Sequence, residues 1–434
     1  MKTIKLGLIG LGTVGGGTLA ILRDSADLLQ QRVNANIEVS IIAVRDLNKP
    51  RAVDTGSIQL TDDPTQVVNH PDVDIVVELM GGTGLARELV LRAIDNGKHV
   101  VTANKALLAE HGDEVFAAAE KQGVQVAYEA AAAGGIPIIK ALREGLSANN
   151  IDWVAGIING TGNYILTEMK QPGADFNAVL KRAQELGYAE ADPTFDVEGI
   201  DAAHKLTILA SLAFGIPLQF EKVYTEGISR ISADDMRFAD MLGYEIKHLG
   251  IARRTDDGVS MRVHPTLIPK SVLLANVSGV MNAVMTHGDH VGPTLYYGPG
   301  AGAGPTASAV VADIVDVVRA LDCAPDARVP ALGFRTTRDL PVMDMEAVQC
   351  AAYLRFLAKD APGVLARFST VLAEQGISIE HMHQEPCDDG SGDALVVLIT
   401  NEVPESAMNT AIAALEALPE IDGTVQRIRI ESLS

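Results

Sequence analysis

The sequence predicts an α/β protein with three parts: an amino-terminal doubly wound domain, a central α+β domain and a carboxyl-terminal βαββαβ unit. Residues 3–128 alternate short apolar runs with longer amphipathic stretches, the pattern of a parallel sheet with helices on both faces. Glycines are spaced Gly-x-Gly-x-x-Gly directly after the first run. Residues 349–434 read strand, helix, strand, strand, helix, strand, which is ferredoxin-like order.

The first domain, residues 1–134, is predicted as a Rossmann domain from five strands. These strands are IKLGLIG, IEVSIIAV, DIVVELM, KHVVTAN and VQVAYEA. A helix over 85–97 is expected to end at Gly97, and a helix that starts at Lys105 is expected to be capped by Asn104.

The central domain, residues 135–321, is predicted as an α+β domain from its mixed order of strands and helices. It contains a strand at 151–160 and a strongly apolar helix at 306–321. Such a helix buries most of its surface, and it is expected to return to the first domain. Prolines 325, 330 and 341 mark residues 322–348 as a linker to the last domain at 349–434.

The charge of the chain limits its expected partners, and its cysteine content indicates its expected compartment. The chain carries 56 acidic and 35 basic residues and a net charge of -21, which repels phosphate backbones and anionic lipid, so nucleic acid and membranes are not expected partners. Three scattered cysteines fit reduced thiols in a cytoplasmic protein.

The glycine motif is Gly10-Leu11-Gly12-Thr13-Val14-Gly15. It follows a strand and opens a helix, as dinucleotide binding requires: a tight turn at Gly10, close phosphate approach at Gly12 and helix packing at Gly15. Thr13 and Val14 lie in the same turn. The helix amino terminus supplies the positive potential that the whole chain lacks.

The end of the second strand bears on the choice of cofactor. Arg45 favours a 2′-phosphate and hence NADP, whereas Asp46 beside it favours the free ribose of NAD. NADP is the preferred prediction, with NAD as the alternative. A plain surface pair of Arg45 and Asp46 also fits the sequence.

Residues 188–205 concentrate five acids before a single lysine. If a helix begins between 198 and 200, Asp201 and Lys205 lie four residues apart on one face. The ordinary interpretation is an exposed helical salt bridge worth a few tenths of a kcal/mol. The nearby cofactor motif favours a functional interpretation. The acids are Glu190, Asp192, Asp196, Glu198 and Asp201.

The spacing from Ala183 to Lys205 is similar to the characteristic motif of homoserine dehydrogenases. The resemblance extends to GLIGLGTVGGG at the start, VTANK at 101–105, NGTGNYIL at 159–166 and GPGAGAGPTA at 298–307. It covers residues 1–320.

The resemblance implies interconversion of L-homoserine and L-aspartate 4-semialdehyde, with residues 135–321 as the catalytic, substrate-binding and dimerisation domain. Lys205 then corresponds to the proton donor, and Lys105 to a lysine between nicotinamide and substrate. Glu190 and Asp201 correspond to homoserine ligands, and carboxylates suit a substrate that carries an ammonium group. Gly302 corresponds to a residue near the nicotinamide.

The resemblance also implies a structural sodium ion at Glu129, Ala132, Gly134 and Ile136, bound through oxygen atoms. A tight helix-packing segment is the plainer interpretation of this stretch. Residues 356–365 resemble the start of an ACT domain, a sensor of small molecules. Asp360 and Gly363 are therefore expected to bind an effector, with threonine as the hypothesis. Pairing of such domains favours a homodimer or homotetramer.

Two other functions stay open at this point. One is a different hydroxy-acid dehydrogenase with Rossmann and ACT domains, which would normally use a histidine and an acid. The other is a catalytically silent amino-acid sensor, which the presence of Lys105, Lys205 and Glu190 disfavours.

Overall fold

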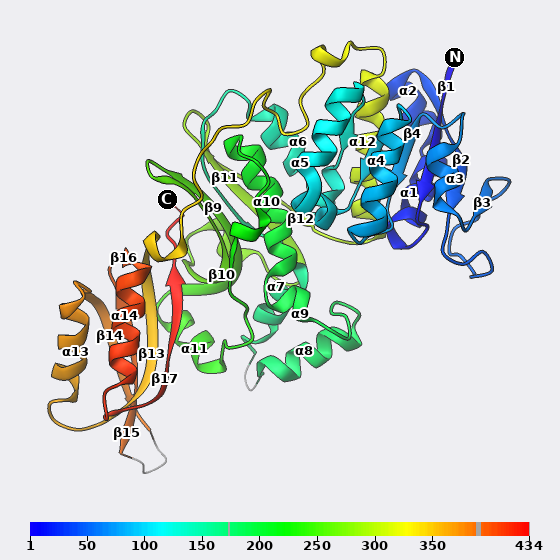
Figure 1. Ribbon diagram of the computed structural model, residues 1–434. Helices are drawn as coiled ribbons and strands as arrows, with labels where there is room; N and C mark the ends of the chain where they lie inside the picture. The colour runs from blue at the N-terminus through cyan, green and yellow to red at the C-terminus, as the bar shows by residue number, and fades with distance from the viewer. Residues whose placement is uncertain (172–173, 388–391, 434) are drawn as a thin grey trace.

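The computed structural model describes residues 1–171, 174–387 and 392–433. Figure 1 shows the amino-terminal part at one end of an elongated molecule, the central part in the middle and the carboxyl-terminal part at the far end. This arrangement confirms the predicted α/β class with three parts.

The first domain is built on a parallel six-stranded sheet with the order β3-β2-β1-β4-β5-β6. The predicted strands are confirmed, because apolar residues buried on both faces give continuous apolar runs. The structure adds β3, α2 and α3, which lack such runs. The elements are β1 (Lys2–Ile9), β2 (Ala35–Ala43), β3 (Gln59–Thr61), β4 (Ile75–Glu78), β5 (His99–Thr102), β6 (Val126–Ala127), α1 (Thr13–Asp24), α2 (Ala26–Val33), α3 (Pro64–Asn69), α4 (Gly84–Asp95) and α5 (Lys105–Gln122).

Helix α12 (Ala303–Ala320) packs against α1 although the two lie far apart in the sequence. A Cβ atom added at Gly17 would lie 2.5 Å from the carbonyl oxygen of Ala303. The two backbones therefore approach closely, and the contact explains why this helix is so apolar.

The central domain combines an antiparallel sheet with helices around α10. Every residue of α10 from Asp201 to Phe214 is buried, so its polar side chains need partners inside the protein. The elements are β7 (Ile151–Ile157), β8 (Tyr224–Thr225), β9 (Tyr244–Thr255), β10 (Gly258–Pro269), β11 (Met281–Gly288), β12 (Gly292–Pro299), α6 (Ile138–Lys140), α7 (Gly160–Glu168), α8 (Phe176–Glu185), α9 (Thr194–Val197), α10 (Ile200–Phe214) and α11 (Ala233–Met241).

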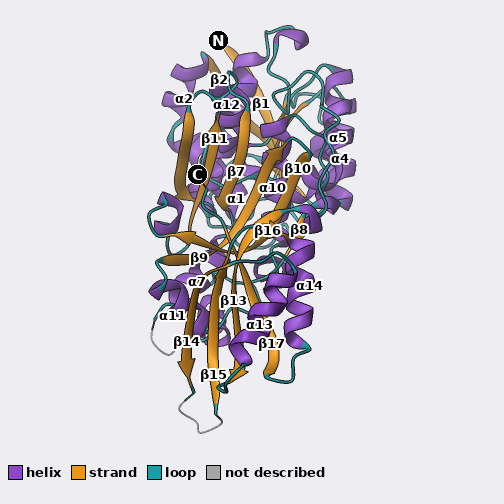
Figure 2. Cartoon of the chain, turned by 90° about the vertical axis from the view of Figure 1, so that its left-hand side faces the viewer, coloured by secondary structure: helices purple, strands orange, loops and turns teal. Residues whose placement is uncertain are grey.

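The last domain has the predicted βαββαβ order and the sheet order β17-β13-β15-β14. Its sheet is not separate: β17 pairs in parallel with β10, so that both sheets form one eleven-stranded sheet (Figure 2). The sequence did not predict this junction. The elements are β13 (Gln349–Lys359), β14 (Ile379–Pro386), β15 (Asp393–Thr400), β16 (Val403–Pro404), β17 (Ile421–Ile430), α13 (Val364–Glu374) and α14 (Glu405–Glu416).

Among the described residues, no helix combines the length and the apolar character needed to cross a membrane.

Candidate active site

The glycine turn lies at the carboxyl end of β1, where α1 begins. Gly10 has φ +102°, which only glycine adopts readily, and a Cβ atom at Gly15 would overlap the carbonyl oxygen of Gly10. Apart from Gly12 itself and its two chain neighbours, no described residue has an atom within 4 Å of the point where a Cβ of Gly12 would stand. Space beside Gly12 and free amides at the start of α1 fit the pyrophosphate of a dinucleotide.

Lys105 is the first residue of α5 and follows the carboxyl end of β5, at the same edge of the sheet as the glycine turn. Asn104 caps the helix by accepting a hydrogen bond from the Leu107 amide at 3.1 Å, as the sequence predicted. The buried Glu78 accepts a hydrogen bond from the Thr102 hydroxyl at 2.7 Å and another from the Met80 amide at 2.8 Å. Glu78, which was not predicted as a site residue, connects the loops after β4 and β5 through these hydrogen bonds.

Asp201 and Lys205 face each other on α10, as their spacing predicted. The Lys205 ammonium donates to Asp201 Oδ2 at 2.6 Å and to the carbonyl oxygen of Ile158 at 2.7 Å. Lys205 is 9% exposed and Asp201 is 4% exposed, so the exposed salt bridge is excluded. The Lys105 ammonium lies 2.9 Å from Asp201 Oδ1. One carboxylate thus holds two lysines from two domains.

Asn159 completes this cluster and was not predicted as a site residue. Its side-chain nitrogen donates to Asp201 Oδ2 and to Asp196 Oδ1, both at 2.8 Å. Its side-chain oxygen accepts the Gly162 amide at 2.7 Å, which caps α7. The motif at 159–166 contained this signal, because an asparagine at a helix start followed by glycines is a capping pattern.

The charges in the cluster shift one another's pKa values. Burial lowers the pKa of Lys205, and the Lys105 charge adds to this effect, while Asp201 opposes both. Burial alone would raise the pKa of Asp201, but the two lysines outweigh it and hold that pKa well below its usual range. Burial also opposes the charge of Lys105, yet the Asp201 carboxylate raises its pKa overall. Asp201 is therefore a permanent anion at neutral pH.

The acidic loop before α10 lies beside the lysines. Glu190 is exposed, and its charge contributes to the raised pKa of Lys105. Asp192 accepts the Thr194 amide at 3.1 Å and so shapes the loop. Burial raises the pKa of Asp196, and the Asp201 charge adds to this shift.

Arg45 is exposed just beyond the end of β2, in the position expected for a contact with the adenosine ribose. Asp46 Oδ1 accepts the Asn48 amide at 2.9 Å in its own turn.

The segment predicted to hold sodium is buried and turns sharply, with positive φ at Ala133 and Gly134. Glu129 Oε1 accepts the Ile139 amide at 2.9 Å, and Oε2 accepts the Lys140 amide at 2.8 Å. Each carboxylate oxygen keeps a free lone pair. Ala132 and Ile136 are buried in the same turn.

Gly302 precedes α12 with φ +120°. Because Ala303 contacts Gly17 of α1, Gly302 lies near the helix that the glycine turn opens. In the last domain, Gly363 has φ +92° at the start of α13, and Asp360 Oδ1 accepts a hydrogen bond from Gln384 at 3.1 Å.

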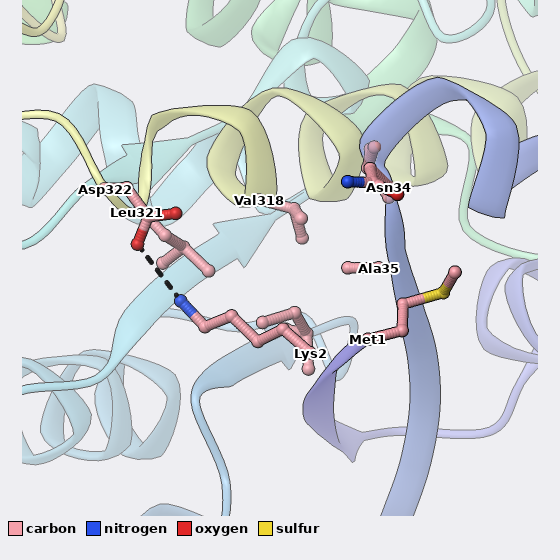
Figure 3. A pocket seen from close by; sticks show the side chains of 9 residues that line it. Met1, Lys2, Asn34, Ala35, Val318, Leu321 and Asp322 are labelled. Carbon is pink, nitrogen blue, oxygen red and sulfur yellow. Dashed lines mark hydrogen bonds and ion pairs between the residues drawn. The ribbon is translucent and has the colours of Figure 1, made fainter.

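A hollow of about 530 Å³ lies at the opposite, amino-terminal end of β1 (Figure 3). Met1, Lys2, Asn34 and Asp322 are among its lining residues, and Lys2 pairs with Asp322 at 3.2 Å. This hollow is not part of the cofactor site, because dinucleotides bind beyond the carboxyl ends of the strands.

A Rossmann sheet carries Lys105 at its carboxyl edge, and this lysine pairs with the buried Asp201, which also holds the buried Lys205. This combination defines the class: an NAD(P)-dependent oxidoreductase. Three family models match the chain: the NAD binding domain of homoserine dehydrogenase at residues 10–129, homoserine dehydrogenase at 137–315 and the ACT domain at 352–420. The chain belongs to the homoserine dehydrogenase family.

Relatives match the chain over its full length or over most of it. A homoserine dehydrogenase of Pseudomonas aeruginosa is 60% identical and covers 100% of both chains. The crystal structure of a homoserine dehydrogenase from Thiobacillus denitrificans is 58% identical, with a TM-score of 0.95 over 100% of this chain and 99% of that one. A hyperthermophilic archaeal homoserine dehydrogenase mutant in complex with NADPH is 25% identical, with a TM-score of 0.62 over 73% of this chain and 97% of that one.

Proposed function

We propose that this chain interconverts L-homoserine and L-aspartate 4-semialdehyde, with Lys205 as the proton donor to the substrate carbonyl oxygen. The supporting observation is the buried ammonium of Lys205, held between Asp201 and the Ile158 carbonyl at hydrogen-bond distance. When bound, the nicotinamide cofactor supplies or accepts the hydride. Lys205 gives its proton to the oxygen in the reductive direction and takes it back in the oxidative one.

The electrostatics suit this role. An exposed lysine is a weak acid at neutral pH, and burial makes Lys205 a stronger one. The Asp201 carboxylate opposes this lowering of the Lys205 pKa and so favours the protonated lysine. Lys105, whose pKa is raised, stays protonated beside the reacting group and offers a second positive charge to the oxygen.

Glu190 and Asp201 are the proposed ligands of the substrate ammonium. Glu190 is exposed and free to turn toward a ligand, whereas Asp201 already orients both lysines. Carboxylates complement an ammonium group and would disfavour hydroxy acids that lack one. This feature speaks against the other hydroxy-acid dehydrogenases.

NADP is the proposed cofactor, held by Gly10, Gly12, Thr13, Val14 and Gly15 at the pyrophosphate, with Lys105 and Gly302 near the nicotinamide. The Arg45 side chain is exposed, as a contact with a 2′-phosphate requires, whereas the Asp46 carboxylate accepts the Asn48 amide within its own turn. The archaeal relative in complex with NADPH supports the same choice.

A structural sodium ion is proposed at Glu129, Ala132, Gly134 and Ile136. Burial raises the pKa of Glu129, and burial together with the Glu129 charge raises the pKa of Asp313, whose carboxylate accepts the Glu129 amide at 2.7 Å. A cation would offset this accumulation of buried carboxylates. Replacing sodium by choline should then lower the melting temperature, and Glu129→Gln should remove that dependence.

Threonine is the proposed effector, with Asp360 and Gly363 at its site. Apart from Gly363 itself and its two chain neighbours, no described residue has an atom within 4 Å of an added Cβ at Gly363, which leaves room for a carboxylate beside the start of α13. A homodimer or homotetramer is also proposed. The edge strand β12 supports it, because Tyr297 on that strand is 58% exposed.

One assay tests the proposed reaction: the absorbance of reduced nicotinamide is followed with L-homoserine and either NADP or NAD. Turnover with homoserine and a lower KM for NADP are expected. An absence of turnover with both cofactors would leave the silent sensor as the better interpretation. A threonine titration that moves neither activity nor melting temperature would exclude the proposed effector.

A further inference from the structure

A buried charged cluster joins the ACT domain to the central domain. Arg429 of β17 is 1% exposed and donates to both carboxylate oxygens of Glu405, at 2.9 and 2.8 Å. Its remaining nitrogen donates to Glu226 Oε2 at 2.6 Å. Glu226 belongs to the central domain and follows β8, and the Tyr224 hydroxyl donates to the same oxygen at 2.9 Å. The guanidinium thus fixes Glu226 from across the domain junction.

The Glu226 segment is tied to the start of α10 by its backbone. The Ile228 amide donates to the Val197 carbonyl at 2.9 Å. A Cβ atom at Gly227 would overlap the Glu198 carboxylate, so the two segments are in direct contact. Residues 226–228 therefore do not shift without moving residues 197–198, the last residues before Gly199 and α10.

His248 links the same segment to the catalytic cluster. Its Nε2 donates to the Glu226 carbonyl oxygen at 3.0 Å, because a carbonyl only accepts. The ring lies 3.2 Å from the point where a Cβ of Gly199 would stand, and 3.6 Å from that of Gly162. Gly199 begins α10 with φ +84°, and the Gly162 amide holds Asn159, which in turn holds Asp201.

We propose that Glu226 is a positioning residue for the Asp201–Lys205 pair, and that Arg429 of the ACT domain sets its position. The contacts run from Arg429 to Glu226, then through His248 and residues 197–199 to the first turn of α10. The proposal rests on the proposed catalytic role of Lys205. It assigns a function to a charge cluster that otherwise only joins two domains.

A second ion pair between the same domains provides the control. Arg355 of β13 donates to Asp235 Oδ1 at 2.7 Å. Asp235 caps α11 through Ser232. This pair anchors the ACT domain but leads into α11 rather than α10. Its loss should therefore weaken the junction without moving Lys205.

The experiment compares Glu226→Gln with Arg355→Gln in the full-length enzyme. Glu226→Gln keeps the shape and removes the charge, and it should lower kcat by about threefold to 30-fold, while the KM for NADP stays unchanged. Arg355→Gln should lower the melting temperature and leave kcat at the wild-type value. If the role of Glu226 were only structural, Glu226→Gln would lower the melting temperature as Arg355→Gln does and would leave kcat at the wild-type value.

A double variant tests the order of the contacts. If Arg429 acts through Glu226, then Arg429→Gln added to Glu226→Gln should lower kcat little beyond the single change. Should Arg429→Gln fail to fold, because it leaves two carboxylates facing each other, Glu226→Gln alone decides. Wild-type kcat in Glu226→Gln, or an equal loss of kcat in Arg355→Gln, would overturn the proposal.

Lys205→Met distinguishes a failure of the positioning role of Glu226 from a failure of the proposed catalytic role of Lys205. An inactive Lys205→Met with an unaffected Glu226→Gln refutes only the positioning role. A Lys205→Met variant that keeps its turnover refutes the proposed catalytic role instead.

Discussion

Asp201 Oδ2 lies 2.6 Å from the Lys205 ammonium, one helical turn away, and both side chains are buried. A buried lysine with one carboxylate and one carbonyl partner is unusual, because the desolvation of its charge is costly. Lys105, at the carboxyl edge of the dinucleotide-binding sheet, contacts the same carboxylate, so this buried lysine lies beside the proposed cofactor site.

Lys205→Ala should reduce kcat by about 10²-fold to 10⁴-fold, because general acid catalysis contributes an effect of this size. The affinity for NADP should stay close to wild type, since the lysine acts in the transition state. Steady-state kinetics and a cofactor titration measure both effects. Lys121→Ala, at the exposed end of α5, is the control. Near wild-type turnover in Lys205→Ala would contradict the assignment.

Asp201→Asn should move the pH dependence of semialdehyde reduction. Asp201 raises the pKa of Lys205 against the lowering by burial, so removing its charge lowers that pKa further. In the proposed reaction the reduction needs protonated Lys205, and the alkaline limb of the rate profile should therefore shift to lower pH. An unchanged limb in this variant would show that another group is the acid.

Arg45→Ala should raise the KM for NADP by about tenfold or more, the loss expected for charge-assisted hydrogen bonds to a phosphate. The KM for NAD should change little, because NAD lacks the 2′-phosphate. Kinetics with both cofactors, with Arg51→Ala as a neighbouring control, check this expectation. Equal losses for the two cofactors would contradict the role of Arg45.

Gly17→Ala should destabilise the protein by about 1–3 kcal/mol, because the added Cβ would lie 2.5 Å from the Ala303 carbonyl oxygen. Gly16→Ala is a matched control in the same helix: its nearest atom, on Val53, is 3.7 Å away. The control should be neutral or slightly stabilising, since alanine favours helix. Chemical denaturation of both variants measures the difference. Equal destabilisation would mean that α1 and α12 do not approach so closely.

His248→Gln should flatten the acid dependence of stability. Burial lowers the pKa of His248 to about 4 from an unfolded value of 6.5. Protonation of His248 therefore favours the unfolded state. The free energy of unfolding that the neutral His248 contributes above pH 6.5 is lost as the pH falls toward 4. The loss amounts to about 2–3 kcal/mol. Unfolding free energies between these pH values should decline less in the variant, while His290→Gln, at an exposed site, should follow wild type.

The local sequence was sufficient to predict much of the fold and half of the buried cluster around Asp201. Apolar alternation predicted the parallel sheet and the βαββαβ unit, because each pattern reflects burial within one element. Glycine spacing predicted the turn at Gly10–Gly15, and the four-residue spacing placed Asp201 and Lys205 on one face. The short strand β3 and the junction of β10 with β17 gave no such signal.

Neighbouring residues along the chain therefore account for the helices, strands, caps and glycine turn. Long-range packing was needed to bring Lys105 to Asp201, to join Asp196 to it through Asn159, and to place Glu226 against Arg429. Each of these contacts joins segments distant in sequence. The packing of whole domains brings them together, and burial there fixes which charges must pair.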